Sequence, residues 1–429
     1  MYSSEIDSSN NHAVPIDFVL FALTLAGVAV FHHHTLAVAL TGLTAIVIYQ
    51  LLFGQFPAGS GLAGLVTHLQ HEWVIIANLA LLLLGFAILS RHFEKSHVPL
   101  ALPRLLPDDW KGCFALLAIV FVLSSFLDNI AAALIGGAMA HTLFKKVHLG
   151  YLAAIVAASN AGGSGSVVGD TTTTMMWIDG VDPRDVLHAY VAAIVALVVS
   201  GLVAAFQQHG YSPILPTTQH KPKIDWVRVG IVVAMLLAAI AANVVINIRY
   251  PALADAFPFI GAAVWVMIFL TAPIRRPDWE LLREAGKGAA FLLSLVLAAS
   301  MMPVDRLPAA SWQTAFGLGF VSAVFDNIPL TKLALEQGGY DWGILAFAVG
   351  YGGSMIWFGS SAGVAISNLF PQARSVGGWV KNGWHVAVAY VIGFFAMLLL
   401  VGWHPHEPQK ATTASAIIMQ CQLTSSYSR

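Results

Sequence analysis

The chain has 429 residues, of which 58% are hydrophobic and 10% are charged, and its mean hydropathy is +0.75. Soluble globular domains carry about 25% charged residues. The composition therefore indicates an integral membrane protein rather than a soluble enzyme or binding module. A formal net charge of -1 predicts no nucleic-acid partner. The two cysteines are too few and too far apart to imply a disulfide framework.

Apolar segments follow one another along the chain, several of them near the roughly 20 residues that cross a bilayer. In chain order we expect them at 16–31, 35–53, 73–90, 112–127, 130–144, 150–178, 186–206, 227–248, 256–272, 286–302, 311–325, 328–336, 341–370 and 379–403. Residues 54–72 contain glycine, proline and histidine, so we expect an interfacial stretch there. We therefore predict an all-α polytopic membrane protein, with the lipid bilayer as its surroundings.

A polar, proline-rich segment divides this chain into two halves. We expect an N-terminal half at 1–206, a linker at 207–226, a C-terminal half at 227–403 and a polar tail at 404–429. Each half is predicted to contain one repeat.

Two motifs recur in the two halves in the same order. The sequence SSFLDNIAAALI at 124–135 corresponds to SAVFDNIPLTKL at 322–333, and GGSGSVVGDTTTT at 162–174 corresponds to GGSMIWFGSSAGV at 352–364. Glycine-rich breaks inside apolar segments, at corresponding positions of two halves, are typical of discontinuous transmembrane helices at a transporter's binding site. A glycine pair can also be a simple packing site for two helices.

The short apolar segments on either side of Asp128-Asn129 predict a re-entrant hairpin, and residues 311–336 predict a second one. With these hairpins, most of the 21 basic residues fall on one side of the membrane. The positive-inside rule makes this side cytoplasmic, together with the linker 207–226. Both termini are then external, and the hairpins enter from opposite faces. The two repeats are therefore predicted to have inverted topology.

The acids at the hairpin tips predict an ion site. A carboxylate at the bilayer centre costs about 3 kcal/mol on insertion scales, so Asp128 and Asp326 need compensation. Hairpin tips that line a water-filled cavity would provide it. Carboxylate, carbonyl and hydroxyl oxygens suit Na⁺, a hard cation, and we expect no transition metal. A buried structural pair between Asp326 and Lys332 is the alternative.

The paired DNI motifs, SNAGGSGSVVGDTTTTMMW and AVFDNIPLTKLAL resemble the NhaD-type sodium/proton antiporters. These belong to an ion transporter superfamily that includes arsenite pumps and citrate and dicarboxylate carriers. The resemblance covers about 73 to 403. It implies a homodimeric, elevator-type carrier in a bacterial inner membrane, with a scaffold, a moving transport domain and a small ion as substrate.

The resemblance also implies which residues form the site. Those at or near the ion, with roles in proton coupling, would be Asp128, Asn129, Asp170, Thr171, Thr172, Asp326 and Asn327. The residues that support the two helix breaks would be Gly162, Gly163, Ser164, Gly352, Gly353, Ser354, Ser360 and Ser361. We expect no cofactor beyond the transported Na⁺ and H⁺, and no catalytic residue.

Two other functions compete with antiport. A sodium-coupled carrier of citrate or another di- or tricarboxylate would bind its anion at helix N-termini and hydroxyl groups. Lys332, at hairpin depth, favours that function modestly. A distant alternative is an intramembrane aspartyl protease, because Gly169-Asp170 and Tyr340-Asp341 approach its motifs without matching them.

Overall fold

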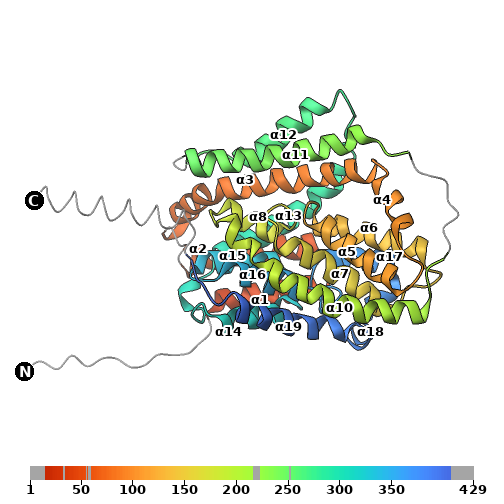
Figure 1. Ribbon diagram of the computed structural model, residues 1–429. Helices are drawn as coiled ribbons and strands as arrows, with labels where there is room; N and C mark the ends of the chain where they lie inside the picture. The colour runs from red at the N-terminus through yellow and green to blue at the C-terminus, as the bar shows by residue number, and fades with distance from the viewer. Residues whose placement is uncertain are drawn as a thin grey trace, which may run out of the picture.

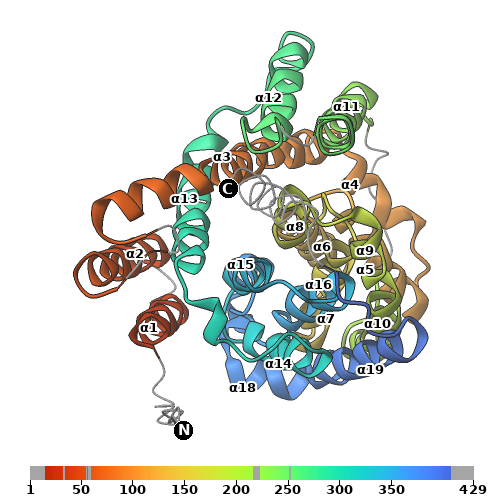
Figure 2. The same ribbon diagram turned by 90° about the vertical axis from the view of Figure 1, so that its left-hand side faces the viewer.

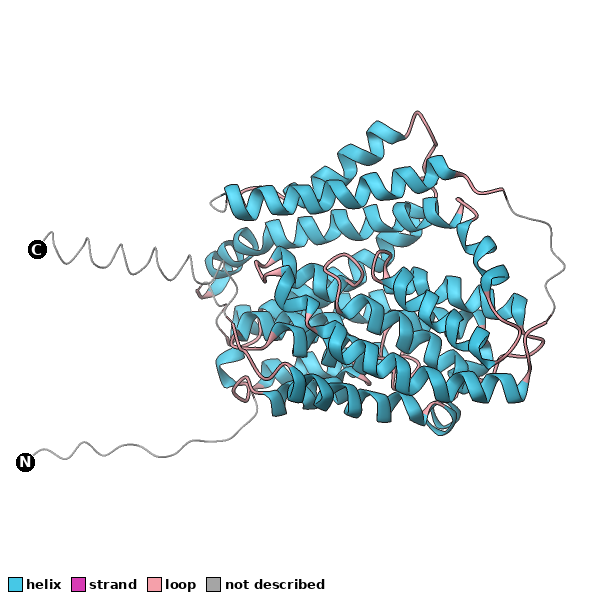
Figure 3. Cartoon of the chain, in the orientation of Figure 1, coloured by secondary structure: helices cyan, strands magenta, loops and turns pink. Residues whose placement is uncertain are grey.

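The computed structural model describes residues 15–31, 34–54, 56, 59–215, 223–250 and 253–406. Within these residues the regular secondary structure is helical, and the β contribution is two isolated bridges (Figure 3). The all-α prediction is therefore confirmed. Parts of the predicted linker (216–222) and tail (407–429), and the first 14 residues, lie outside the described residues.

The helices in the N-terminal half are α1 (Ile16–Val30), α2 (Thr35–Leu52), α3 (Gly61–Glu94), α4 (Val98–Ala101), η1 (Leu102–Leu105), α5 (Trp110–Ser124), α6 (Asn129–Leu143), α7 (Leu149–Ser164), α8 (Thr171–Ile178), α9 (Pro183–Leu187) and α10 (Ala189–Tyr211). Those in the C-terminal half are α11 (Trp226–Val244), η2 (Val245–Arg249), α12 (Phe259–Thr271), α13 (Leu281–Ser300), η4 (Val304–Arg306), α14 (Trp312–Ser322), α15 (Asn327–Gln337), α16 (Trp342–Gly352), α17 (Ser361–Leu369), η5 (Pro371–Arg374), α18 (Val376–Asn382) and α19 (Trp384–Leu400).

Four helical stretches in the described part of the chain are long and apolar enough to cross a membrane. They are Thr35–Leu52, Gly61–Glu94, Pro183–Tyr211 and Trp226–Ile246. The pair α18 and α19, bent by 59°, would make a fifth. The structure thus agrees with a polytopic membrane protein in which shorter helices complete the interior.

Two segment boundaries in the structure differ from the predicted ones. Residues 61–72 are continuous with the apolar segment predicted at 73–90, because they form the first part of the 34-residue helix α3. His68 and Glu72 in that stretch are buried, and both contact polar side chains of other helices. In addition, α10 continues to Tyr211, five residues into the predicted linker, and ends just before Ser212-Pro213.

The helices form two parts (Figures 1 and 2). Helices α1, α2, α3, α11, α12 and α13 form an arc along one side, which we call the scaffold part. Helices α5–α10 and α14–α19 pack together inside this arc and form the core part. The two parts meet mainly where α13 contacts α15 and α3 contacts α8.

The core part contains the same series of elements twice. A helical hairpin, α5–α6 or α14–α15, is followed by a broken helix, α7–α8 or α16–α17. Every residue of α7 from Gly150 to Ser164, and every residue of α16, is buried. A helix that is apolar on all sides belongs in the interior, so the two broken helices form the centre of the core part.

The two hairpins open at opposite ends of α10. At the first hairpin, the N–H of Leu215, just beyond α10, donates to the carbonyl of Leu143 at the end of α6 (2.8 Å). At the second, α16 follows α15 directly and contacts α9, which leads into the start of α10. Because α10 has 23 residues, these ends are about 35 Å apart. Inverted repeats require the two hairpins to enter from opposite ends of the molecule, as they do here. The repeat relation itself stays a prediction.

One end of the molecule gathers the basic loops. Lys95 pairs with Asp278 (2.8 Å), Arg275 pairs with Asp225 (2.9 Å), and the Asp225 N–H donates to Ser96 (2.9 Å). We call this the basic end, formed by residues 91–111, 144–149, 211–215, 223–228 and 272–283. The predicted hairpins place the loops at 91–111 and 145–149 on one side of the membrane with the linker, and the structure gathers them at one end. Their cytoplasmic location stays a prediction.

Candidate functional site

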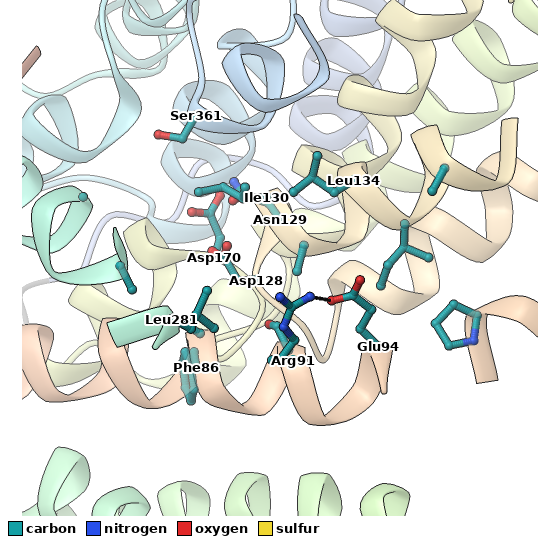
Figure 4. Close-up of a pocket in the computed structure, with 18 of the residues that line it drawn as sticks. Phe86, Arg91, Glu94, Asp128, Asn129, Ile130, Leu134, Asp170, Leu281 and Ser361 are labelled. Carbon is teal, nitrogen blue, oxygen red and sulfur yellow. Dashed lines mark hydrogen bonds and ion pairs between the residues drawn. The ribbon is translucent and has the colours of Figure 1, made fainter. Parts of the chain in front are cut away.

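A cavity of about 1070 Å³ lies between the two parts of the molecule (Figure 4). Its scaffold wall consists of apolar side chains of α3 and α13, such as Leu82, Phe86 and Leu292, with charged side chains only near the C-terminal end of α3. Its core wall is α6, from the hairpin tip at Asp128 to Leu143. The cavity therefore extends from the tip of the first hairpin to the basic end.

The first hairpin places its Asp-Asn pair at the inner end of this cavity. Asp128 is the N-cap residue of α6 and is half-buried, and its carboxylate lies near the N–H groups of Asn129, Ile130 and Ala131 without a capping hydrogen bond of good geometry. Asn129 is buried, and its side-chain amide donates to Asn160 (3.2 Å). Both residues line the cavity. The Asp128 carboxylate is therefore available to a ligand that arrives through the cavity.

The first helix break adds a second carboxylate. Asp170 caps α8 with one oxygen, Oδ1, which accepts from the Thr172 N–H (3.1 Å). Its other oxygen, Oδ2, is buried without a hydrogen bond of good geometry, and so is the Thr172 hydroxyl, which lies close to the carboxylate. Asp170 and Thr171 line the cavity. An unpartnered buried polar atom in a native protein calls for an explanation such as a bound ion.

The second hairpin contributes differently. The Asp326 carboxylate accepts from the Ile328 N–H (3.1 Å) and from the Ser361 hydroxyl (3.3 Å), so both of its oxygens are engaged. Asp326 does not line the cavity, whereas Asn327 and Ser361 do. The side-chain nitrogen of Asn327 is buried without a partner. Of the three predicted acids, Asp128 and Asp170 are thus the better placed to bind a cation.

Asn160 joins the two halves at the site and was not predicted from the sequence. Its side chain accepts from Asn129 and donates to the hydroxyls of Ser354 (2.9 Å) and Ser360 (3.1 Å). Ser360 also caps α17 by accepting from Gly363 (3.3 Å). The sequence feature that could have identified Asn160 is a single amide side chain in an apolar segment, two residues before Gly162-Gly163.

The predicted glycines allow close approach of backbones at the two breaks. A Cβ atom at Gly162 would overlap the carbonyl oxygen of Phe121 in α5, and one at Gly352 would overlap that of Gly319 in α14. Gly163 and Gly353 pack in the same way against the residues that end their own breaks. Ser164 donates to its own helix at Ala161 (2.8 Å). These residues position the breaks rather than face the cavity.

The predicted alternative that pairs Asp326 with Lys332 is wrong. The Lys332 Nζ atom lies 2.9 Å from an oxygen of Glu72 in α3 and 2.5 Å from one of Glu336 in α15. Lys332 is 2% exposed and does not line the cavity. Sequence spacing could not reveal Glu72, because it lies 260 positions away in the other half.

The acid of the Tyr340-Asp341 dipeptide lies away from the cavity. The Asp341 carboxylate accepts from the N–H groups of Ile344 (3.0 Å) and His404 (2.9 Å), which caps α16 and fixes the segment after α19. It therefore cannot pair with Asp170 as a protease dyad requires. Within the described part of the chain, no three His, Cys, Asp or Glu side chains are arranged to hold a metal.

Charged groups at the mouth of the cavity form a network on the scaffold part. Arg91 pairs with Glu94 (2.6 Å) and Asp278 (3.1 Å), and Lys95 also pairs with Asp278. The hydrogen bond from Lys95 lowers the pKa of Asp278, and that from Arg275 lowers the pKa of Asp225. A carboxyl whose pKa is lowered by folding adds stability at neutral pH and loses it on acidification. At physiological pH these solvent-accessible ion pairs favour the arrangement of the basic end, each by a small amount because solvent screens them.

Comparisons with known proteins point to transporters. "Sodium/proton antiporter 1" of Arabidopsis thaliana is 28% identical over 318 residues, which are 63% of this chain and 53% of that protein. "Sodium/proton antiporter 2" of the same plant is 27% identical over 321 residues, 62% of this chain and 73% of that protein. The chain thus spans about half the length of the first of these relatives.

A solved structure of Neisseria gonorrhoeae MtrF, described as illuminating a class of antimetabolite efflux pumps, aligns with a TM-score of 0.49 and 13% identity. The alignment covers 92% of this chain and 98% of that one. No protein-family model matches the chain. The two Arabidopsis thaliana proteins are named as antiporters rather than enzymes, which agrees with the expectation of transport rather than catalysis.

Proposed function

We propose that this protein is a secondary transporter that exchanges Na⁺, or Li⁺, for H⁺, in the manner of NhaD-type antiporters. The cation binds at Asp128 and Asp170, with the neighbouring oxygens of Asn129, Thr171, Thr172 and Asn327 completing its shell. Asp326 holds Ser361 at the edge of the site. The similarity to two proteins named sodium/proton antiporters supports this proposal.

The observation that carries the proposal is the position of the carboxylates at the helix breaks. Asp128, Asp170 and Asp326 each occupy the N-cap position of a helix, at α6, α8 and α15. Helix N-termini favour negative charge, which lowers the cost of keeping carboxylates inside the membrane. Because the Asp128 carboxylate makes no capping bond of good geometry and Asp170 Oδ2 makes no hydrogen bond of good geometry, a cation or a proton can neutralise them.

The same arrangement argues against a carrier of citrate or another dicarboxylate. An anion needs unoccupied helix N-termini or basic side chains at the site. Here aspartates already occupy three of the N-termini, and Lys332 is engaged by Glu72 and Glu336. The arginines and lysine of the cavity lining, Arg91, Lys95 and Arg104, belong to the basic end. A di-anion at the tip would therefore meet carboxylates.

Antiport follows if sodium and protons compete for the same carboxylates. The empty site carries two negative charges, so it cannot cross the membrane without a bound ion. Because it must carry either sodium or protons, the sodium and proton fluxes are coupled. We propose that the core part carries the site past the scaffold part in an elevator-type movement. The cavity in the present conformation gives access from the basic end, which we place in the cytoplasm of a bacterial cell, and the carrier is a homodimer.

Transport by purified protein in proteoliposomes tests the function. A sodium gradient should move protons in the opposite direction, measured with a pH-sensitive dye inside the vesicles, and Li⁺ should replace Na⁺. Labelled citrate should not accumulate with or without sodium. Sodium-stimulated citrate uptake without proton movement would instead establish the carboxylate carrier.

A further inference from the structure

A buried charge cluster connects the scaffold part to the core part, away from the cavity. Glu72 belongs to the scaffold helix α3, whereas Lys332 and Glu336 belong to the hairpin helix α15. The side chains of Glu72 and Lys332 are 3% and 2% exposed, and that of Glu336 is 30% exposed. The Glu72 contact is an ion pair by distance (2.9 Å), although its geometry lies outside that of a hydrogen bond.

The position of this cluster is opposite to that of the cavity. The cavity extends from the hairpin tips to the basic end. Along α15, Lys332 is six residues beyond Asp326, or about 9 Å, in the direction of the other end of the molecule. The cluster therefore lies between α3 and α15 on the side of the site that faces away from the cavity.

Neighbouring polar groups fix both sides of the contact. On the scaffold part, His68 lies one turn before Glu72 and hydrogen-bonds to Ser300 of α13 (2.9 Å). On the core part, Asp179, just after α8, also acts electrostatically on Lys332. Carboxylates thus outnumber the lysine, so it keeps a partner if any one acid is neutralised.

Net stability does not explain why these charges are buried. Taking two ions out of water costs about as much as their attraction returns, and apolar replacements are often neutral or stabilising. A buried ion pair is better suited to specifying which two surfaces meet. Here it specifies that α15 meets α3 at Glu72.

We propose that Glu72 and Lys332 are the two sides of an ionic lock between the scaffold part and the core part. The pair is formed while the site is accessible from the basic end, and it separates when the core part moves to expose the site at the other end. Glu336 is the partner that stays with Lys332 during the movement, because both residues are on α15. This inference rests on the proposed alternating-access transport.

Two isosteric variants separate a lock from a merely structural cluster. Glu72→Gln removes the carboxylate across the interface, and Glu336→Gln removes the one within α15. Each variant takes one negative charge from the cluster and leaves Lys332 with one carboxylate partner. If the cluster only supports folding, the substitutions can differ in their effect on stability, but neither should shift the equilibrium between the two access states. If it is a lock, only Glu72→Gln should shift the conformational equilibrium.

The reporter is a cysteine at Ala138, which is exposed and lines the cavity. Cys113 and Cys421 are first replaced by alanine and serine. The rate of maleimide labelling of the full-length chain in lipid nanodiscs then measures how often the cavity is open. We expect Glu72→Gln to slow labelling about threefold or more, because the open state loses its specific pair. Glu336→Gln should label at the parent rate.

A charge exchange provides the rescue. The double variant Glu72→Lys with Lys332→Glu keeps one cation between two carboxylates and should restore the parent rate. If Glu72→Gln does not fold, Glu72→Asp shortens the same side chain and should slow labelling in the same direction. Equal labelling of Glu72→Gln and the parent, or equal slowing in Glu336→Gln, would overturn the lock. Labelling needs no sodium gradient, so this outcome is independent of which ion is transported.

Discussion

At the scale of single residues, the structure divides the predicted ion ligands into two groups. In the first group, the Asp128 carboxylate makes no capping bond of good geometry, and one side-chain atom each of Asp170 and Asn327 has no protein partner. Asn129 and Asp326 are engaged by other side chains. Sequence reasoning could identify these residues because polar groups are costly inside an apolar segment. It could not rank them, because the ranking depends on hydrogen bonds between segments far apart in the chain.

The two asparagines should therefore respond differently to alanine. Asn327→Ala should weaken sodium binding about three- to tenfold without changing the unfolding temperature, because its side-chain nitrogen has no protein partner. Asn129→Ala should weaken binding and also destabilise the protein by about 1–3 kcal/mol, because it deprives buried Asn160 of a donor. Sodium titrations and thermal unfolding of both variants measure this. Normal sodium affinity in Asn327→Ala would remove that amide from the site.

At the scale of elements, the helix breaks were the most predictable feature of the chain. The glycine-rich motifs predicted discontinuous helices, and both breaks occur where expected, at 165–170 and 353–360. Their physical reason is the absence of Cβ atoms where a hairpin backbone passes close by, as at Gly162 and Gly352. The length of α3 was not predictable in the same way, because its polar residues are matched by partners on α13 and α15.

Gly162→Ala should accordingly be a strongly destabilising change. Its added methyl group meets backbone, the Phe121 carbonyl, which cannot turn aside as a flexible side chain can. Overpacking of this kind costs about 1–3 kcal/mol. Gly230→Ala in α11 is the matched control, since nothing lies within 4 Å of its added atom, and it should be neutral or slightly stabilising. The unfolding temperatures of the two variants in detergent measure this difference. Equal unfolding temperatures would contradict close packing of the helix break against the Phe121 carbonyl.

At the scale of the whole molecule, the division into a scaffold part and a core part gives the site its access. The charge distribution in the sequence predicted which loops share one side, and the ion pairs among Lys95, Asp278, Arg275 and Asp225 bring them together. Neither composition nor motif spacing could predict which helices form the walls of the cavity expected at the hairpin tips. It arises from the way α3 and α13 face α6 across the interface of the two parts.

Orientation in the membrane follows from that charge distribution. Lys145→Cys, at the basic end, should be inaccessible to an impermeant thiol reagent added outside intact cells, because basic loops stay in the cytoplasm. Asp305→Cys, in the connection between α13 and α14, should react. Both positions are exposed in the structure. The reverse labelling pattern would invert the molecule and turn the cavity outward.

We propose that Asp170 carries either a proton or a sodium ion, and the variant Asp170→Asn tests this role. The amide keeps an oxygen and the capping bond to Thr172, but it cannot carry the proton. Asp341→Asn is the control, because it makes the same change at a buried N-cap outside the cavity.

Sodium-dependent proton flux in proteoliposomes, recorded over a range of pH, is the measurement. In the parent protein, apparent sodium affinity should fall by up to about tenfold per pH unit as protons compete for the site. Asp341→Asn should behave like the parent, and Asp170→Asn should move no protons in response to sodium. Unchanged proton flux in Asp170→Asn would contradict the account.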